Sequence, residues 1–150
     1  MSSATRLALP TAALTALAFG AAAAAATPVS AAPNTTPQKV CGADYKTVNS
    51  APVGSLGTVY LTYNAANGKN CVATIRNNPG AAVEASSWVF IPDTEEYAED
   101  NGDFTSYAGP VYATGKGHCV DWGGHIQQVH VQVTGSNCGR LQEHRVTYTN

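Results

Sequence analysis

Basic residues are scarce in this 150-residue chain, which carries 8 Lys and Arg against 10 Asp and Glu. A surface that binds nucleic acid or an anionic membrane needs clustered positive charge, because it has to neutralise phosphate groups. A net charge of −2 at pH 7 offers no such surplus. We therefore expect no nucleic acid among the partners of this protein and, once its N-terminal segment is removed, no membrane.

Motifs of secreted enzymes and of metalloproteins are also missing. The sequence has no G-x-S-x-G, the turn that exposes a nucleophilic serine in many hydrolases. It also has no C-x2-C pair of the kind that structural zinc sites use. The sequence therefore predicts a protein that is not an enzyme and that needs neither a metal nor another cofactor.

Helical periodicity is absent from every long window, and short β-branched and aromatic runs bounded by Gly, Asn and Pro begin at Thr58. The pair Asn67-Gly68 favours a hairpin, because both residues tolerate a positive φ. The apolar block from Trp88 to Ile91 predicts a strand covered on both faces. We predict a single all-β domain over residues 41–150, a small disulfide-stapled antiparallel sandwich or barrel.

The N-terminal segment has the layout of a secretory signal peptide, with one charge at Arg6 and an unbroken small and apolar run from Leu7 to Ala26. The small residues that a signal peptidase reads follow at Val29-Ser30-Ala31. We predict a signal peptide over residues 1–31, then a flexible polar lead-in over residues 32–40. The mature protein should be secreted and extracellular.

All four cysteines lie in the exported part, and an even number in an oxidising compartment indicates two disulfides among three alternative pairings. We predict the pairs Cys41–Cys71 and Cys119–Cys138, because each closes a local segment and sequential elements are usually spatial neighbours.

Six acidic residues lie within the segment 93–103. Their spacing lacks the D-x-[DN]-x-[DN]-G pattern of a loop that wraps calcium, so we expect a solvated acidic loop.

The stretch "HCVDWGGH" gathers residue types that ligate zinc or relay protons. If Gly123-Gly124 forms a two-residue hairpin turn, strand alternation puts His118 and Asp121 on opposite faces. His130 then falls on the side of Asp121, and His118 lies roughly 13 Å from His125 along their shared face. The pattern favours a scaffold over a catalytic or metal site.

Three weaker candidates for a site remain. The trio of His144 between Glu143 and Arg145 resembles the acid, base and arginine of a small secreted nuclease, but on a strand His144 would face away from its two neighbours. The segment Asn77–Ala82 is a candidate exposed loop for protease inhibition. The aromatic candidates for a glycan-binding surface are Tyr107, Tyr112 and Trp122.

Several stretches of the mature chain resemble the spore-associated proteins of streptomycetes and related actinobacteria. They are "CGADYKTVNS" (41–50), "GTVYLTYN" with "GKNCVAT" (57–74), "DFTSYAGPV" (103–111), "CVDWGG" (119–124) and "CG" (138–139). The resemblance implies a secreted, non-catalytic β domain associated with the spore or cell surface, with spore-surface or cell-wall components as partners. It supplies no catalytic residues, and the chain departs from the family pattern in the acidic segment and in the tail 140–150.

We expect signal peptidase to cut after Ala31, because cutting one residue later would leave Pro33 directly after the scissile bond. The N-terminus of protein recovered from culture medium, read by Edman degradation or mass spectrometry, measures this. A cell-bound chain that retains Met1 would contradict the prediction.

Overall fold

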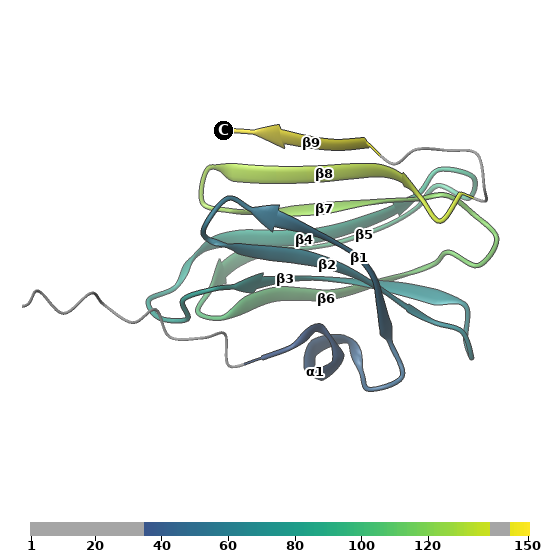
Figure 1. Cartoon of the computed structure of the whole chain (residues 1–150), viewed down its shortest axis with the longest axis horizontal. Coiled ribbons are helices and arrows are strands. Elements are labelled where there is room, and N and C mark those ends of the chain that lie inside the picture. Colours follow the sequence, from purple (N-terminus) through teal and green to yellow (C-terminus); the bar gives the residue numbers. More distant parts are fainter. Residues whose placement is uncertain (1–34, 139–144) are drawn as a thin grey trace, which may run out of the picture.

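The structure is a computed structural model that describes residues 35–138 and 145–150. Within these residues the chain forms two antiparallel sheets packed face to face, with one short helix below the four-stranded sheet (Figure 1). The elements are α1 (Pro37–Cys41), β1 (Lys46–Val53), β2 (Gly57–Asn64), β3 (Lys69–Arg76), β4 (Val83–Ile91), β5 (Glu96–Phe104), β6 (Tyr107–Thr114), β7 (Val120–Ile126), β8 (Val129–Ser136) and β9 (Arg145–Thr149).

One sheet has the strand order β1-β2-β3-β6 and the other β5-β4-β7-β8-β9. The expected all-β sandwich is confirmed, and the two sheets do not join into a closed barrel. The hairpin expected at Asn67-Gly68 is also confirmed, because β2 turns into β3 there with Gly68 at a φ of 72°. In the part of the chain that the structure describes, no helix is long and apolar enough to cross a membrane.

The core lies between the sheets and is built mainly from alternate residues of β1, β2, β4, β6, β7 and β8, with Val72 of β3, whereas all five residues of β9 are exposed. Trp122 of β7 is its largest fully buried side chain, and the indole Nε1 donates a hydrogen bond to Ser136 Oγ at 2.8 Å. The sequence placed Trp122 on a binding surface, and that expectation is wrong. Its indole points inward because side chains alternate along β7, so that Trp122 shares the inner face with its partner Val89 while Gly123 lies on the outer face.

Both predicted disulfides are present, Cys41–Cys71 and Cys119–Cys138. The first joins Cys41, the last residue of α1, to β3. Part of the lead-in 32–40, which was expected to be flexible, belongs to this helix, which begins at Pro37. Loops of 30 and 19 residues predict a contribution of about 3 to 4 kcal/mol from each bond. The two bonds together are comparable with the whole free energy of unfolding of a small domain, roughly 5 to 15 kcal/mol.

The pair Gly123-Gly124 lies in the middle of β7 and forms no turn, so the hairpin expected there is wrong. The chain turns at Gln127-Gln128 instead, with Gln127 at a φ of 54°. A Cβ on Gly123 would overlap the Val131 carbonyl and stand 2.7 Å from the Trp88 ring, and one on Gly124 would overlap the Ser86 carbonyl and Thr74 Oγ1. Steric crowding on both faces of the sheet, and not turn geometry, requires the two glycines.

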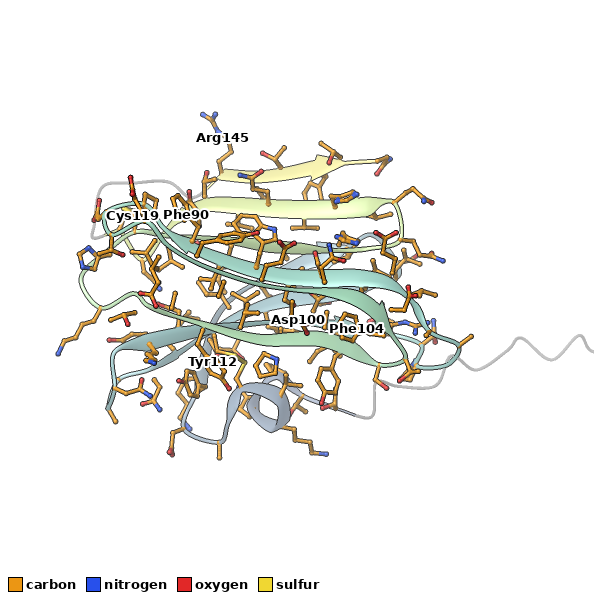
Figure 2. All side chains as sticks on the ribbon, turned by 180° about the vertical axis from the view of Figure 1, so that it is seen from behind. Phe90, Asp100, Phe104, Tyr112, Cys119 and Arg145 are labelled. Atoms are coloured by element: carbon orange, nitrogen blue, oxygen red, sulfur yellow. A yellow bond between two sulfur atoms is a disulfide. The ribbon has the colours of Figure 1, made fainter. Side chains whose placement is uncertain are left out.

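The acidic segment expected to be a loop forms most of β5 instead. Its inward side chains reach β6, which ends the four-stranded sheet. Asp100 accepts a hydrogen bond from the Gly109 backbone N–H at 2.8 Å, and Glu96 accepts one from the Thr114 N–H at 2.9 Å. These carboxylates bind donors at the edge of a sheet and so join the two sheets along one side. Asp100 is labelled in Figure 2.

Substituting Gly124→Ala should lower the free energy of unfolding by about 1 to 3 kcal/mol, because the added methyl group overlaps backbone and the Thr74 hydroxyl. Gly80→Ala is the matched control, since nothing lies within 4 Å of the position its Cβ would take. Urea unfolding followed by circular dichroism compares the two. Equal free energies of unfolding for the two variants would contradict a steric cost of the added methyl group at Gly124.

Candidate functional site

A groove of about 810 Å³ crosses the outer face of the five-stranded sheet, on the side away from the core. Its lining comes from all five strands of that sheet. The residues are Glu84, Ser86, Trp88, Phe90, Tyr97, Glu99, Asn101, Gly124, His125, His130, Val131, Gln132, Thr147 and Thr149. Strand alternation builds it, since the intervening residues of β4 and β7 point into the core.

Aromatic rings form the β4–β5 side of the groove. Phe90 and Tyr97 meet edge to face across the two strands, with ring centroids 6.4 Å apart. Trp88 pairs with Gly123 of the neighbouring strand, and its ring occupies the space that a side chain there would fill. Tyr97 is 56% exposed. The groove therefore offers partly exposed aromatic surface from two adjacent strands.

The Tyr97 hydroxyl donates a hydrogen bond to Glu99 Oε2 at 2.9 Å. Partial burial raises the pKa of Tyr97, and the hydrogen bond and negative charge of Glu99 raise it further. The phenol is therefore neutral at physiological pH and remains a hydrogen-bond donor.

Two histidines meet in the centre of the groove, where His125 of β7 pairs with His130 of β8 and the ring centroids lie 4.7 Å apart. His125 Nδ1 is hydrogen-bonded to Ser86 Oγ at 2.7 Å. Its Nε2 lies 3.9 Å from Glu84 Oε1, is buried, and has no hydrogen-bond partner among the described residues. The sequence predicted that His125 and His130 lie on opposite faces, because a turn was assumed at Gly123-Gly124 and not at Gln127-Gln128.

Ser86, His125 and Glu84 lie next to one another as the serine, histidine and acid of a hydrolase triad do. Their geometry differs from that of a triad in two respects. The distance of 3.9 Å between His125 Nε2 and Glu84 exceeds a hydrogen bond. Ser86 is only 2% exposed, so a substrate carbonyl has little access to its Oγ. The arrangement supports ligand contact better than nucleophilic attack.

The other residues of "HCVDWGGH" have structural partners. His118 Nδ1 lies 3.0 Å from Asp93 at the surface, and Asp121 accepts a hydrogen bond from the Gly135 N–H. Among the described residues, no three His, Cys, Asp or Glu side chains come together as a metal site would require. The expectation that folding needs no metal remains a prediction.

The two tyrosines nominated from the sequence lie on β6 of the other sheet, away from the groove. Tyr112 packs against the Tyr45 ring and donates a hydrogen bond to the Cys41 carbonyl at 3.0 Å, next to α1 (Figure 2). Burial raises the pKa of Tyr112, with a smaller contribution from Tyr45. Tyr107 is 37% exposed.

The remaining sequence candidates lie elsewhere. Glu143 and His144 fall outside the described residues, and Arg145 begins β9 at the outer edge of its sheet (Figure 2). The loop Asn77–Ala82 joins β3 to β4 and is held by a hydrogen bond from Arg76 to the Ala81 carbonyl at 2.9 Å.

The groove residues of β4 and β5 were missed although a signal for them exists. Outward positions alternate as Glu84, Ser86, Trp88 and Phe90 in "VEASSWVFI", and as Tyr97, Glu99 and Asn101 in "EYAEDNGDF". This period of two indicates strands with one polar and aromatic face. It was hidden by interpreting residues 88–91 as covered on both faces and the acidic segment as a loop, whereas Trp88 and Phe90 are partly exposed.

Burial lowers the pKa of His125 below its ordinary 6.5, His130 lowers it further, and Glu84 and Glu99 oppose the shift. The unfolded chain then binds a proton at a higher pH than the folded protein, so protonation favours unfolding. We expect the free energy of unfolding to fall as pH drops from 6.5 through the lowered pKa, and to fall less in His125→Gln.

Urea unfolding between about pH 7 and pH 5 tests this dependence. His118→Gln, which removes a histidine from outside the groove, is the control and should keep the pH dependence of the unchanged protein. An equal pH dependence in His125→Gln would contradict the assignment.

Comparison with known proteins shows that the chain is similar in sequence to a spore-associated protein. Spore-associated protein A of Streptomyces coelicolor is 52% identical to this chain over 102 residues, which cover 68% of this chain and 66% of the relative. No family model and no solved structure matches the chain. The resemblance noted from the short sequence stretches is thus confirmed, and the chain belongs to the spore-associated protein family of streptomycetes.

Proposed function

We propose that this protein is an exported, non-catalytic component of the spore or cell surface. The single observation that carries the proposal is the 52% identity to a protein named for its association with spores. The fold is consistent with this role, because two disulfides stabilise a small sandwich that has to persist outside the cell.

The geometry of the groove supports the absence of catalysis. Its serine is buried, and the carboxylate that would orient the histidine lies beyond hydrogen-bond distance. A second candidate function is a secreted binding module for a cell-wall glycan or a protein. The open groove with its aromatic side favours that candidate over a passive coat protein.

Fractionating a sporulating culture tests the location. We expect an antibody against the mature chain to detect it in washed spores or at the cell surface, at the mass of residues 32–150. Purified protein should show no turnover in peptidase, esterase, nuclease and glycosidase screens. A protein confined to the cytoplasm, or turnover that is lost in Ser86→Ala or His144→Ala, would overturn the proposal.

A further inference from the structure

We propose that the groove on the outer face of the five-stranded sheet binds an uncharged polysaccharide. Its sugar rings would stack on Trp88 and Tyr97, and its hydroxyl groups would bond to the polar side chains around them. The inference rests on the proposed role at the spore or cell surface, and it names the ligand class of the binding-module candidate.

The aromatic side of the groove suits a sugar ring, which presents an apolar C–H face and a polar rim. Trp88 and Phe90 are partly exposed, and Tyr97 is 56% exposed. The packing of Trp88 over Gly123 limits the positions its ring can adopt. A pre-positioned ring loses little conformational entropy when a ligand stacks on it.

Residues of the groove face, most of them polar, follow the strand register in two rows across the sheet. One row is Asn101, Ser86, His125, His130 and Thr149, and the other is Glu99, Trp88, Gly123, Gln132 and Thr147. Each row crosses five strands, a span of roughly 19 Å at the usual spacing between strands. That span fits a chain of several sugar rings better than one monosaccharide.

His125 Nε2 gives an independent indication of a ligand. The side chain is 9% exposed, Nδ1 is occupied by Ser86, and Nε2 has no partner among the described residues. A buried polar nitrogen without a partner is costly, so such atoms in proteins usually find a protein, water or ligand partner. A sugar hydroxyl satisfies this nitrogen in either tautomer, because a hydroxyl both donates and accepts.

The charges around the groove favour a neutral polymer. Glu84 and Glu99 line it, and none of its lining residues is Lys or Arg, so a phosphate- or carboxylate-bearing chain would meet negative charge without a Lys or Arg to balance it. A cationic polymer would gain little, since the Glu84 side chain is 65% exposed and exposed ion pairs are weak. Both carboxylates can accept hydrogen bonds from neutral hydroxyl groups.

Tryptophan fluorescence can report on this groove directly. The chain has two tryptophans, and Trp122 is fully buried in the core, so a ligand that enters the groove should change the emission of Trp88. We expect a saturable change when the folded mature protein is titrated with chitohexaose or cellohexaose. Trp88→Phe should abolish the fluorescence change while calorimetry still detects weaker binding.

Tyr97→Ala should weaken binding about tenfold, which corresponds to the loss of one well-placed aromatic contact. Tyr107→Ala is the matched control, because it removes an exposed tyrosine from the other sheet and should leave the affinity unchanged. Near-ultraviolet circular dichroism verifies that each variant is folded.

Four results would overturn the inference. The first two are an absence of saturable binding to both neutral hexaoses at millimolar concentration, and saturation only by a polyanion or by chitosan oligomers. The other two are an equal loss of affinity in Tyr107→Ala, and self-association that covers Trp88 without any glycan. Each would leave the location on spores untouched, because fractionation measures that separately. A protein absent from spores that still binds chitohexaose would contradict the proposed function and not the groove.

Discussion

The close approach of side chains to β7 is the constraint on which both faces of the five-stranded sheet depend. Toward the core, Thr74 of the opposite sheet reaches the position of Gly124. Its hydroxyl donates a hydrogen bond to the Ser86 carbonyl at 2.7 Å and lies 2.9 Å from Ser87 Oγ, which links the sheets through a buried polar contact. Toward solvent, Trp88 takes the space above Gly123. A side chain at either glycine would separate the sheets or displace the ring that forms the groove.

A second set of polar contacts satisfies backbone donors at a sheet edge. A strand at the end of a sheet has unpaired backbone donors that invite association with another chain. On β6 two of these donors bind the carboxylates of Asp100 and Glu96, while the opposite face of β5 carries Tyr97 and Glu99 into the groove. One acidic strand thus joins the two sheets with its inner face and contributes to the proposed binding surface with its outer face.

Under the proposed function, a groove of this kind would let the protein remain attached to a surface polymer without covalent linkage. Aromatic stacking and hydroxyl hydrogen bonds are individually weak, but a polymer presents many equivalent units, so several copies of the protein can bind one chain. The buried Ser86–His125 contact positions an imidazole at the centre of the groove. In the proposed binding mode this imidazole would contact the ligand, since neither the serine nor the carboxylate lies where acyl transfer would require it.

The sequence by itself determined the fold class, the disulfide pairing and the family. Short β-branched and aromatic runs, the Asn67-Gly68 turn and the cysteine separations are local signals, and local physics is sufficient to interpret them. Tertiary structure alone decided the role of Gly123-Gly124, the burial of Trp122 and the pairing of His125 with His130. Glycine serves equally as a turn residue and as a space for a neighbouring ring, and only Trp88 and Thr74, distant in sequence, distinguish the two. The groove has the same origin, because it exists only once β5, β4, β7, β8 and β9 lie side by side.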